Sequence, residues 1–208
     1  MMASITKTLR NQKGVSLVEV LAVLVITTFL TGVAIFVFQS LSTSTYASTE
    51  GRNAQQEAKF ALSQIANALH DSNKVMVPDL DELRFTSFVN DHTAAYKAVY
   101  FVREASGTQG TLWIANFIGS ESQWQNTAIN HSTHPSLYAN NMALAQGLTQ
   151  TPTYTNGDGS AITGTLTGGS TLKLTLSYQL KRKTASGGIM NGNVRTVQTS
   201  VKLYKDGS

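Results

Sequence analysis

The stretch that decides the fold reads Gly14-Val15-Ser16-Leu17-Val18-Glu19-Val20-Leu21, and it opens an apolar run that ends at Phe38. The part from Val20 to Phe38 carries no charge and has about the length, roughly 20 residues, that a helix needs to cross a bilayer. Glu19 stands at the start of this run, where a carboxylate is costly because hydrocarbon does not solvate its charge. A charge in such a place indicates a function that involves a partner for it.

Basic residues precede the run at Lys7, Arg10 and Lys13, and three classes of N-terminus share this arrangement. A secretory signal peptide has an apolar region of roughly 7–15 residues followed by a small-residue cleavage site. Here the apolar run is longer, and no such site follows it. A permanent membrane anchor fits better, because basic flanking residues stay on the cytoplasmic side of a membrane. Neither class gives a reason for Glu19.

The third class accounts for the whole arrangement. A basic leader, then Gly14, then five residues ending in Glu19, then a transmembrane run resemble the class III leader of type IV pilins and type II secretion pseudopilins. In that family a membrane enzyme, prepilin peptidase, cuts directly after the glycine and methylates the new N-terminus. The resemblance implies that Gly14 ends the leader and that Val15 is the first mature residue, where the family usually has Phe. It also implies that Glu19 occupies the family's acidic position.

Elementary electrostatics suggests what Glu19 would do. Cleavage after Gly14 would create an amine at Val15, about one helical turn from Glu19. A neighbouring subunit, shifted along a filament axis, would present its own amine to this carboxylate, and only one axial shift would pair the two charges. The alternative is that Glu19 only reaches the membrane surface at the cytoplasmic end of the helix.

The overall charge of the chain belongs largely to the leader. The 208 residues include 16 basic and 12 acidic ones, which gives a formal charge of +4. Residues 1–14 hold three of the basic residues and no acid, so a mature chain would keep 13 basic residues against 12 acidic ones, a charge of +1. The basic balance is therefore no sign of nucleic-acid binding. The absence of cysteine excludes disulfides, thiol catalysis and zinc–thiolate sites.

A long helix is expected to follow the leader. Between Ala54 and Leu69 the apolar residues recur at helical spacing, which predicts a helix with one buried stripe. The stripe consists of Ala58, Ala61, Leu62, Ile65, Ala68 and Leu69. Because Pro78 stops a helix, we expect one helix from about Val15 to about Lys74, bent near Gly32 or Gly51.

The rest of the chain is expected to form strands, because its apolar residues alternate with a period of two. The expected strands are residues 83–89, 96–103, 111–118, 172–180 and 194–204. We also expect a hairpin loop at 105–110, a short helix at Leu137–Ala145 and a mobile, glycine-rich hairpin tip at Lys181–Asn193. The fold class is then α+β and pilin-like, with a long N-terminal helix, transmembrane in its first half, packed on an antiparallel β-sheet.

These expectations divide the chain into four parts. They are a leader at 1–14, a transmembrane and filament-core helix at 15–38, an extracytoplasmic amphipathic helix at 39–76 and a β-sheet domain at 77–208. A second, looser resemblance rests on Leu83-Arg84-Phe85, residues 99–104 and Leu112-Trp113. These segments are similar to the J-type and W-type minor subunits of the superfamily and to competence pseudopilins.

The residues that could carry chemistry do not form a catalytic pattern. His131 and His134 precede Pro135, which disfavours the helix that would place both imidazoles on one face, so we expect exposed loop histidines rather than a metal site. Asp79, Asp81 and Glu82 are expected to form a solvated acidic turn. The sequence therefore predicts a protein that is not an enzyme.

One loop has a metal-binding interpretation. Asn156, Asp158 and Ser160 place oxygen donors at alternate positions, as at the start of a calcium loop. The distal acid of an EF-hand would fall at Thr167, which is not an acid, so a glycine-rich turn is the preferred interpretation. Apart from this calcium alternative, no cofactor is expected.

A basic patch is expected near the C-terminus, from Lys181, Arg182, Lys183 and Arg195. Such a patch would contact DNA phosphates or an anionic cell-wall polymer. The alternative is an ordinary solvated loop, and the sparse aromatic residues nearby do not favour a single-strand binder.

The combined interpretation is a structural subunit, of the minor kind, in a type IV pilus-like or pseudopilus filament that serves secretion, DNA uptake or pilus assembly. Its expected partners are prepilin peptidase, other pilin or pseudopilin subunits, the inner-membrane assembly platform and the membrane itself. It would cross the membrane once, with the N-terminus cytoplasmic and the C-terminal domain outside, before entering the filament. The alternative is a permanently anchored extracytoplasmic binding or adhesion protein.

Overall fold

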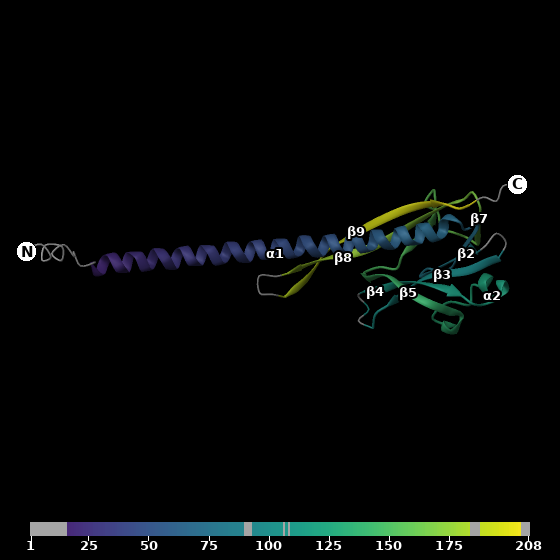
Figure 1. Ribbon diagram of the computed structural model, residues 1–208, viewed down its shortest axis with the longest axis horizontal. Coiled ribbons are helices and arrows are strands. Elements are labelled where there is room, and N and C mark those ends of the chain that lie inside the picture. The colour runs from purple at the N-terminus through teal and green to yellow at the C-terminus, as the bar shows by residue number, and fades with distance from the viewer. Residues whose placement is uncertain (1–15, 90–92, 106, 108, 184–187, 205–208) are drawn as a thin grey trace, which may run out of the picture. The chain divides into compact units, whose positions relative to one another are not determined.

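The computed structural model describes residues 16–89, 93–105, 107, 109–183 and 188–204. These residues form one long helix followed by an antiparallel sheet, as Figure 1 shows. The helices are α1 (Leu17–His70), α2 (Glu121–Gln125) and the short 3-10 helix η2 (Pro135–Leu137). The strands are β1 (Lys74–Asp79), β2 (Glu82–Val89), β3 (Thr93–Arg103), β4 (Gly110–Phe117), β5 (Tyr138–Leu148), β6 (Thr153–Asn156), β7 (Thr165–Thr167), β8 (Thr171–Lys183) and β9 (Ile189–Lys202).

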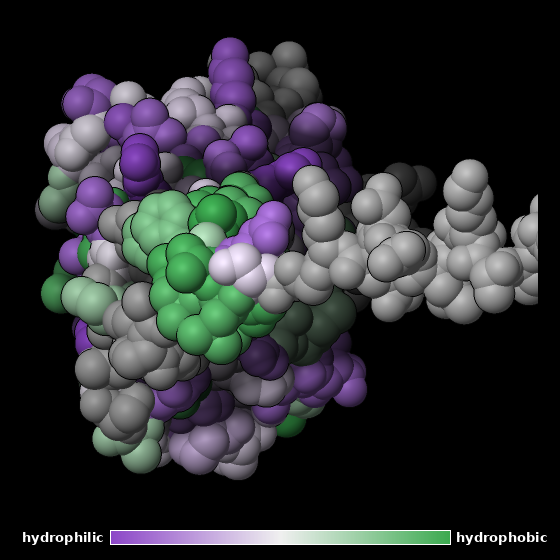
Figure 2. All heavy atoms as spheres, turned by 90° about the vertical axis from the view of Figure 1, so that its left-hand side faces the viewer, coloured by the Kyte–Doolittle hydropathy of each residue, from purple (hydrophilic) through white to green (hydrophobic). Residues whose placement is uncertain are grey.

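The chain forms two compact units, Met1–Thr45 and Tyr46–Ser208, and the described part of the first unit is the beginning of α1. Its most apolar 18-residue window has the length and composition of a membrane span, and none of that window is buried. Figure 2 views α1 from its N-terminal end, where these hydrophobic residues form the bright green area. The segment thus presents apolar side chains on all sides, as a helix surrounded by lipid or by other helices does.

Threonines interrupt the apolar surface of this segment without leaving a polar group unpaired. The hydroxyl of Thr27 donates to the carbonyl of Val23 at 2.7 Å, and that of Thr31 donates to the carbonyl of Thr27 at 2.8 Å. Thr28 bonds the carbonyl of Leu24 at 3.0 Å in the same way. Hydroxyls that are satisfied within their own helix are compatible with an apolar environment.

In the second unit every strand pairing is antiparallel. The strand order is β6-β8-β5-β4-β3-β2-β1-β7, with β9 paired to β8. The link between β5 and β8 is a single pair, Leu148 with Tyr178. The sheet bends around the last part of α1, because strands from both halves of this order contribute side chains to one core with it.

That core contains the predicted stripe of α1. Ala58, Ala61, Leu62, Ile65 and Leu69 are at most 4% exposed, and Ala68 is partly buried against them. They pack on apolar residues of five strands: Val75, Leu83, Phe85, Val99, Leu112, Leu172 and Leu174. Burying each Leu, Ile or Phe side chain contributes about 1.5–3 kcal/mol, which makes this stripe the main attachment of the helix to the sheet.

The opposite face of the sheet is also covered. Because side chains alternate along a strand, Leu83 and Phe85 of β2 face α1, whereas Arg84 faces the other way. On that second face a separate cluster joins β3, β4 and β5 to the segment between β4 and β5. Trp124 of α2 and Ile129 are its contributions from that segment. The sheet therefore lies between two layers, one formed by α1 and one by residues 118–137.

The five predicted strands are confirmed within a few residues at each end. The predicted helix extends too far: α1 ends at His70, and Lys74 already belongs to β1, so the range 39–76 contains the start of a strand. The helix ends earlier because the residues after it pair with two strands: Val75 lies between Phe85 of β2 and Leu166 of β7. Nothing in the local sequence indicated that two strands would flank it.

Two further expectations about the C-terminal half were wrong. The short helix expected at Leu137–Ala145 is strand β5, which pairs with β4 along most of its length. Its alanines suit a helix, but β4 offers an unpaired edge, and ladder formation there outweighs local propensity. The hairpin tip expected at Lys181–Asn193 is shorter, since β8 and β9 stay paired up to Lys183 with Ile189. Residues 184–187 lie outside the described part of the chain.

Candidate functional site

The site that the sequence singles out is the start of α1. The hydroxyl oxygen of Ser16 accepts the backbone N–H of Val18 at 3.3 Å, and its carbonyl accepts those of Glu19 and Val20 at 2.9 and 3.2 Å. Ser16 thereby caps the helix, and Glu19 falls in the first turn. A carboxylate is favourable there, because the N-terminal end of a helix carries partial positive charge.

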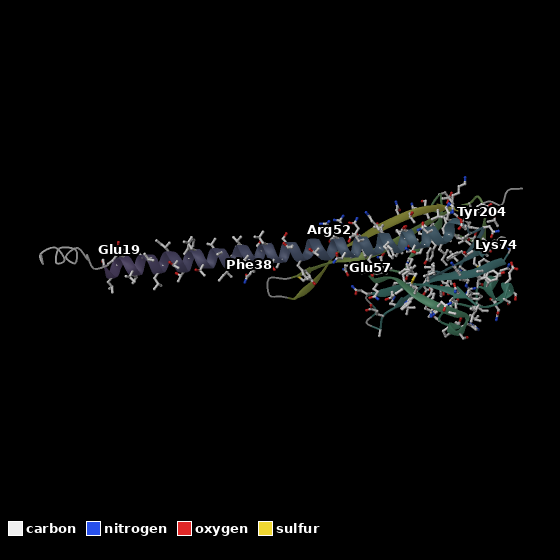
Figure 3. All side chains as sticks on the ribbon, in the orientation of Figure 1. Glu19, Phe38, Arg52, Glu57, Lys74 and Tyr204 are labelled. Atoms are coloured by element: carbon white, nitrogen blue, oxygen red, sulfur yellow. The ribbon has the colours of Figure 1, made fainter. Side chains whose placement is uncertain are left out.

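Glu19 lies at one end of an exposed apolar surface, as the label in Figure 3 shows. Val20, Val23, Leu24 and Thr27 continue the same side of the helix. Among the residues that the structure describes, none pairs with the carboxylate of Glu19. Gly14 and Val15 lie outside these residues, so the predicted cleavage position and the predicted amine are not described.

Comparison with protein-family models gives a match that includes this segment: residues 9–35 fit the prokaryotic N-terminal methylation motif. The chain carries the N-terminal segment of the type IV pilin and pseudopilin superfamily. No curated protein and no solved structure gives a significant match. The pilin-like segment and the fold of α1 on an antiparallel sheet agree with the predicted class. The motif supports a pilin-type structural subunit that prepilin peptidase processes, and the helix that carries it is long and apolar enough to cross a membrane.

Sequence reasoning missed a buried ion pair in the pilin-like domain. The Nε of Arg84 donates to Glu82 Oε1 at 2.6 Å, and the two side chains are 0% and 2% exposed. The hydroxyl of Tyr138 donates to the same carboxylate oxygen at 2.6 Å, and the backbone N–H of His131 donates to Oε2 at 2.9 Å. The expectation that Glu82 belongs to a solvated turn was therefore wrong. Its i, i+2 spacing from Arg84 in a strand was the available signal, because it places both on one face.

Arg84 also donates from Nη2 to the hydroxyl of Tyr138 at 3.2 Å, and its other hydrogen bonds go to backbone carbonyls. Nη1 donates to the carbonyls of Trp124 at 2.7 Å and Asn126 at 3.1 Å, and Nη2 donates to that of Ile129. These acceptors all belong to the segment between β4 and β5, which has little regular structure. The guanidinium therefore supplies the hydrogen bonds that hold this segment against the sheet, and Glu82 supplies the opposite charge that makes its burial tolerable.

His131 belongs to the same cluster and is not an exposed loop histidine. Its ring stacks on that of Tyr100, with centroids 3.8 Å apart and planes 12° from parallel. Burial lowers the pKa of His131 from its usual value, although Glu82 and Asp81 oppose this shift. His134 is exposed, as expected, and bonds Thr133. No group of three potential metal-ligating acids and histidines occurs in the described ranges.

The candidate calcium loop is a turn that is bonded to itself. Asp158 Oδ1 accepts the backbone N–H of Ser160 at 2.9 Å and its hydroxyl at 2.7 Å, and Asn156 Nδ2 donates to the same hydroxyl oxygen at 2.8 Å. The hydrogen bonds from Ser160 lower the pKa of Asp158. The three oxygen donors of the calcium alternative thus lie together in a glycine-rich turn, which was the preferred interpretation, and nothing tests whether they bind calcium.

The residues of the predicted basic patch lie on one hairpin. Lys181, Arg182 and Lys183 end β8, where they pair with Asn191, Met190 and Ile189, and their side chains lie outside the described part. Arg195 of β9 is exposed and stands opposite Tyr178. A single patch formed by these four residues stays a prediction.

Proposed function

We propose that the chain is a subunit, of the minor kind, of a type IV pilus-like or pseudopilus filament. It enters the membrane with its N-terminus in the cytoplasm, and prepilin peptidase cuts it after Gly14. The assembly platform of the inner membrane then moves it into a bundle of N-terminal helices. The observation that carries this proposal is the match of residues 9–35 to the methylation motif, at the start of a helix whose apolar part is unburied.

Glu19 is the assembly residue of this proposal. Ser16 caps α1, so Glu19 lies in its first turn, within about one turn of the amine that cleavage would create at Val15. A carboxylate in an apolar bundle needs a cation, and a neighbouring subunit's Val15 amine is the cation that every processed copy carries. Pairing with it fixes the axial shift between neighbours.

The minor role is the narrower part of the proposal. It rests on the resemblance of the strand segments around Arg84, residues 99–104 and Trp113 to minor subunits. The absence of cysteine adds to this, because many pilins of didermic bacteria close their C-terminal loop with a disulfide, and its absence favours a minor subunit or a monoderm source. Counting the chain against the other subunits in purified filaments, by quantitative mass spectrometry, tests this part.

Mass spectrometry of the mature N-terminus tests the proposal as a whole. The expected chain begins at Val15, with or without a methyl group on its amine. A chain that begins at Met1 would contradict the proposal and support a permanently anchored binding or adhesion protein instead. A chain cut near Ala47 would contradict both, since it would have lost its anchor.

A further inference from the structure

A polar cavity of about 290 Å³ lies beside α1 in the second unit. Asn53 and Glu57 of α1 line it together with Glu104 and Gln109 at the β3–β4 connection, Gln146 at the end of β5 and Gln179 of β8. Glu57 and Glu104 are the charged residues of its lining, so the cavity carries two negative charges and no positive one. Carboxylate and carboxamide oxygens at its walls make it an acceptor site for a cationic group with several N–H donors.

Glu57 is held in place by the sheet. Its Oε1 accepts the backbone N–H of Gln146 at 2.8 Å, which ties α1 to the end of β5. The next residue, Gly147, has φ +66°, a conformation that suits glycine, and this lets the chain expose the Gln146 N–H to the helix. Glu57 Oε2 and the carboxylate of Glu104 form no hydrogen bond within the described ranges, so both remain acceptors.

An exposed cation, Arg52, lies on the same helix but on another side of it. Arg52 is exposed, and no hydrogen bond or ion pair joins it to any part of the chain that the structure describes. It precedes Glu57 by five residues, which turns it about 140° away around α1 and displaces it by about 7.5 Å along the axis. Figure 3 labels both side chains on α1. Arg52 therefore does not fill the cavity of its own chain.

We propose that Arg52 of one copy inserts into the Glu57–Glu104 cavity of a second copy. A guanidinium offers five N–H donors in a planar fork, which suits two carboxylates and several carboxamide oxygens better than a lysine ammonium does. A projecting group on one side and its receptor on another side of the same chain make a heterologous contact, which repeats into an open helical array instead of closing.

This inference rests on the filament role in the proposed function, because it describes a second contact of the same filament. It requires a run of adjacent copies, so a chain that is minor in the filament as a whole would be grouped in one part of it. The two contacts require axial displacements of similar size. Pairing Val15 with Glu19 needs four residues, about 6 Å along α1, and pairing Arg52 with Glu57 needs five, about 7.5 Å. The difference is smaller than the length of an arginine side chain, which is flexible enough to absorb it.

Cysteine cross-linking tests the contact directly, because the chain contains no cysteine of its own. The full chain carrying Arg52→Cys and Glu57→Cys is produced in excess in cells that assemble the filament, and membranes and filaments are oxidised. A helix separates residues five apart by more than a disulfide can bridge, so any bond joins two copies. We expect a ladder of dimers and larger species, since each copy carries both halves of the contact.

The matched control combines Arg52→Cys with Asn67→Cys, which is also exposed on α1 but about 22 Å further along it. This control should give no ladder of cross-linked species.

A second pair of variants tests the contact without cysteine. Arg52→Glu and Glu57→Arg should each lower the amount of chain in sheared filaments about tenfold, and the double variant should restore it, as expected for two opposite charges that pair across a contact.

The outcomes separate this inference from the function on which it rests. If the wild-type chain is not cut after Gly14, the proposed function fails and the contact fails with it. If the chain is cut and sediments with filaments, but the Arg52–Glu57 pair gives no ladder and the double charge reversal gives no rescue, only the contact is overturned. A cross-link that stops at the dimer would also overturn it, because it would indicate a closed contact.

Discussion

Glu82 and Arg84 form an ion pair with 2.6 Å between Oε1 and Nε, and both side chains are buried between the sheet and the segment that covers it. The pair connects two parts of the domain that are about 40 residues apart, because Arg84 also binds the carbonyl of Trp124. The stability of the domain and the position of the segment between β4 and β5 therefore depend on the same two charges.

Removing one charge of this pair should be far more harmful than removing an exposed one. For Glu82→Gln we expect a loss of about 3–5 kcal/mol in the free energy of unfolding, because Arg84 would stay buried without its counter-charge. Urea unfolding of the full chain in detergent, followed by tryptophan fluorescence, measures it. The control is Glu121→Gln, which removes the half-exposed pair with Lys74 and should cost about 0.2–1 kcal/mol. Equal losses in both variants would contradict the role given to the buried pair.

The two sides of α1 should respond differently to truncation. Ile65 is 0% exposed in the core, and Phe60 is 59% exposed on the same helix. Ile65→Ala should lower the free energy of unfolding by about 2–5 kcal/mol, since it removes buried methylenes and leaves a cavity. Phe60→Ala should change it by no more than about 0.5 kcal/mol. A large loss in urea titrations of Phe60→Ala would mean that this side of the helix is also covered.

The stability of the domain should fall in mildly acidic solution because of His131. Burial holds its folded-state pKa below the value of 6.5 that it has when exposed, so the unfolded chain binds the proton more readily. The contribution of the neutral ring is complete above pH 6.5 and is lost as the pH falls from there toward the lower, folded-state pKa. Urea midpoints between pH 5 and 8 should therefore decline on acidification. The decline should be weaker in His131→Gln and unchanged in the exposed control His134→Gln.

Glu19 should be needed for assembly but not for processing. We expect Glu19→Leu to be inserted and cut after Gly14, because the change leaves the cleavage position intact and makes the helix more apolar. The processed chain should then stay in the membrane fraction and be depleted from sheared filaments. Leu21→Val, a neutral change in the same turn, is the control. Normal incorporation of Glu19→Leu would remove the register role of this residue.

Titration calorimetry with calcium should show no binding heat at the Asn156–Ser160 turn. Asp158 already accepts two hydrogen bonds from Ser160, and no second acid stands at the distal ligand position, which Thr167 occupies. A heat that disappears in Asp158→Asn but persists in the distant control Asp79→Asn would show that calcium replaces these internal bonds.

The parts of the fold that could be predicted are those with a periodic signal. The stripe from Ala58 to Leu69 and the alternation in 172–180 each have one buried face, so the spacing of their apolar residues determines the element. The helix at Leu137–Ala145 was wrong because β5 owes its conformation to pairing with β4, and pairing between distant segments leaves no trace in local spacing.

Of the candidate functional residues, only those at the start of α1 could be predicted from the sequence. Glu19 was noticeable because a charge at the start of an apolar run is rare, and the family match covers the same residues. The burial of Glu82 and the cavity beside Glu57 were not predictable, since charged residues in strands and amphipathic helices are usually solvated. Both features arise from segments that only the folded chain brings together.

The threonines in the first part of α1 have a consequence for any change of environment. Thr27, Thr28 and Thr31 donate their hydroxyls to carbonyls of their own helix. These hydroxyls need no hydrogen-bond partner outside the helix. Moving the helix from lipid tails to protein side chains therefore breaks none of these hydrogen bonds. The free-energy difference between the two environments is then left to packing, and to the one carboxylate at its end.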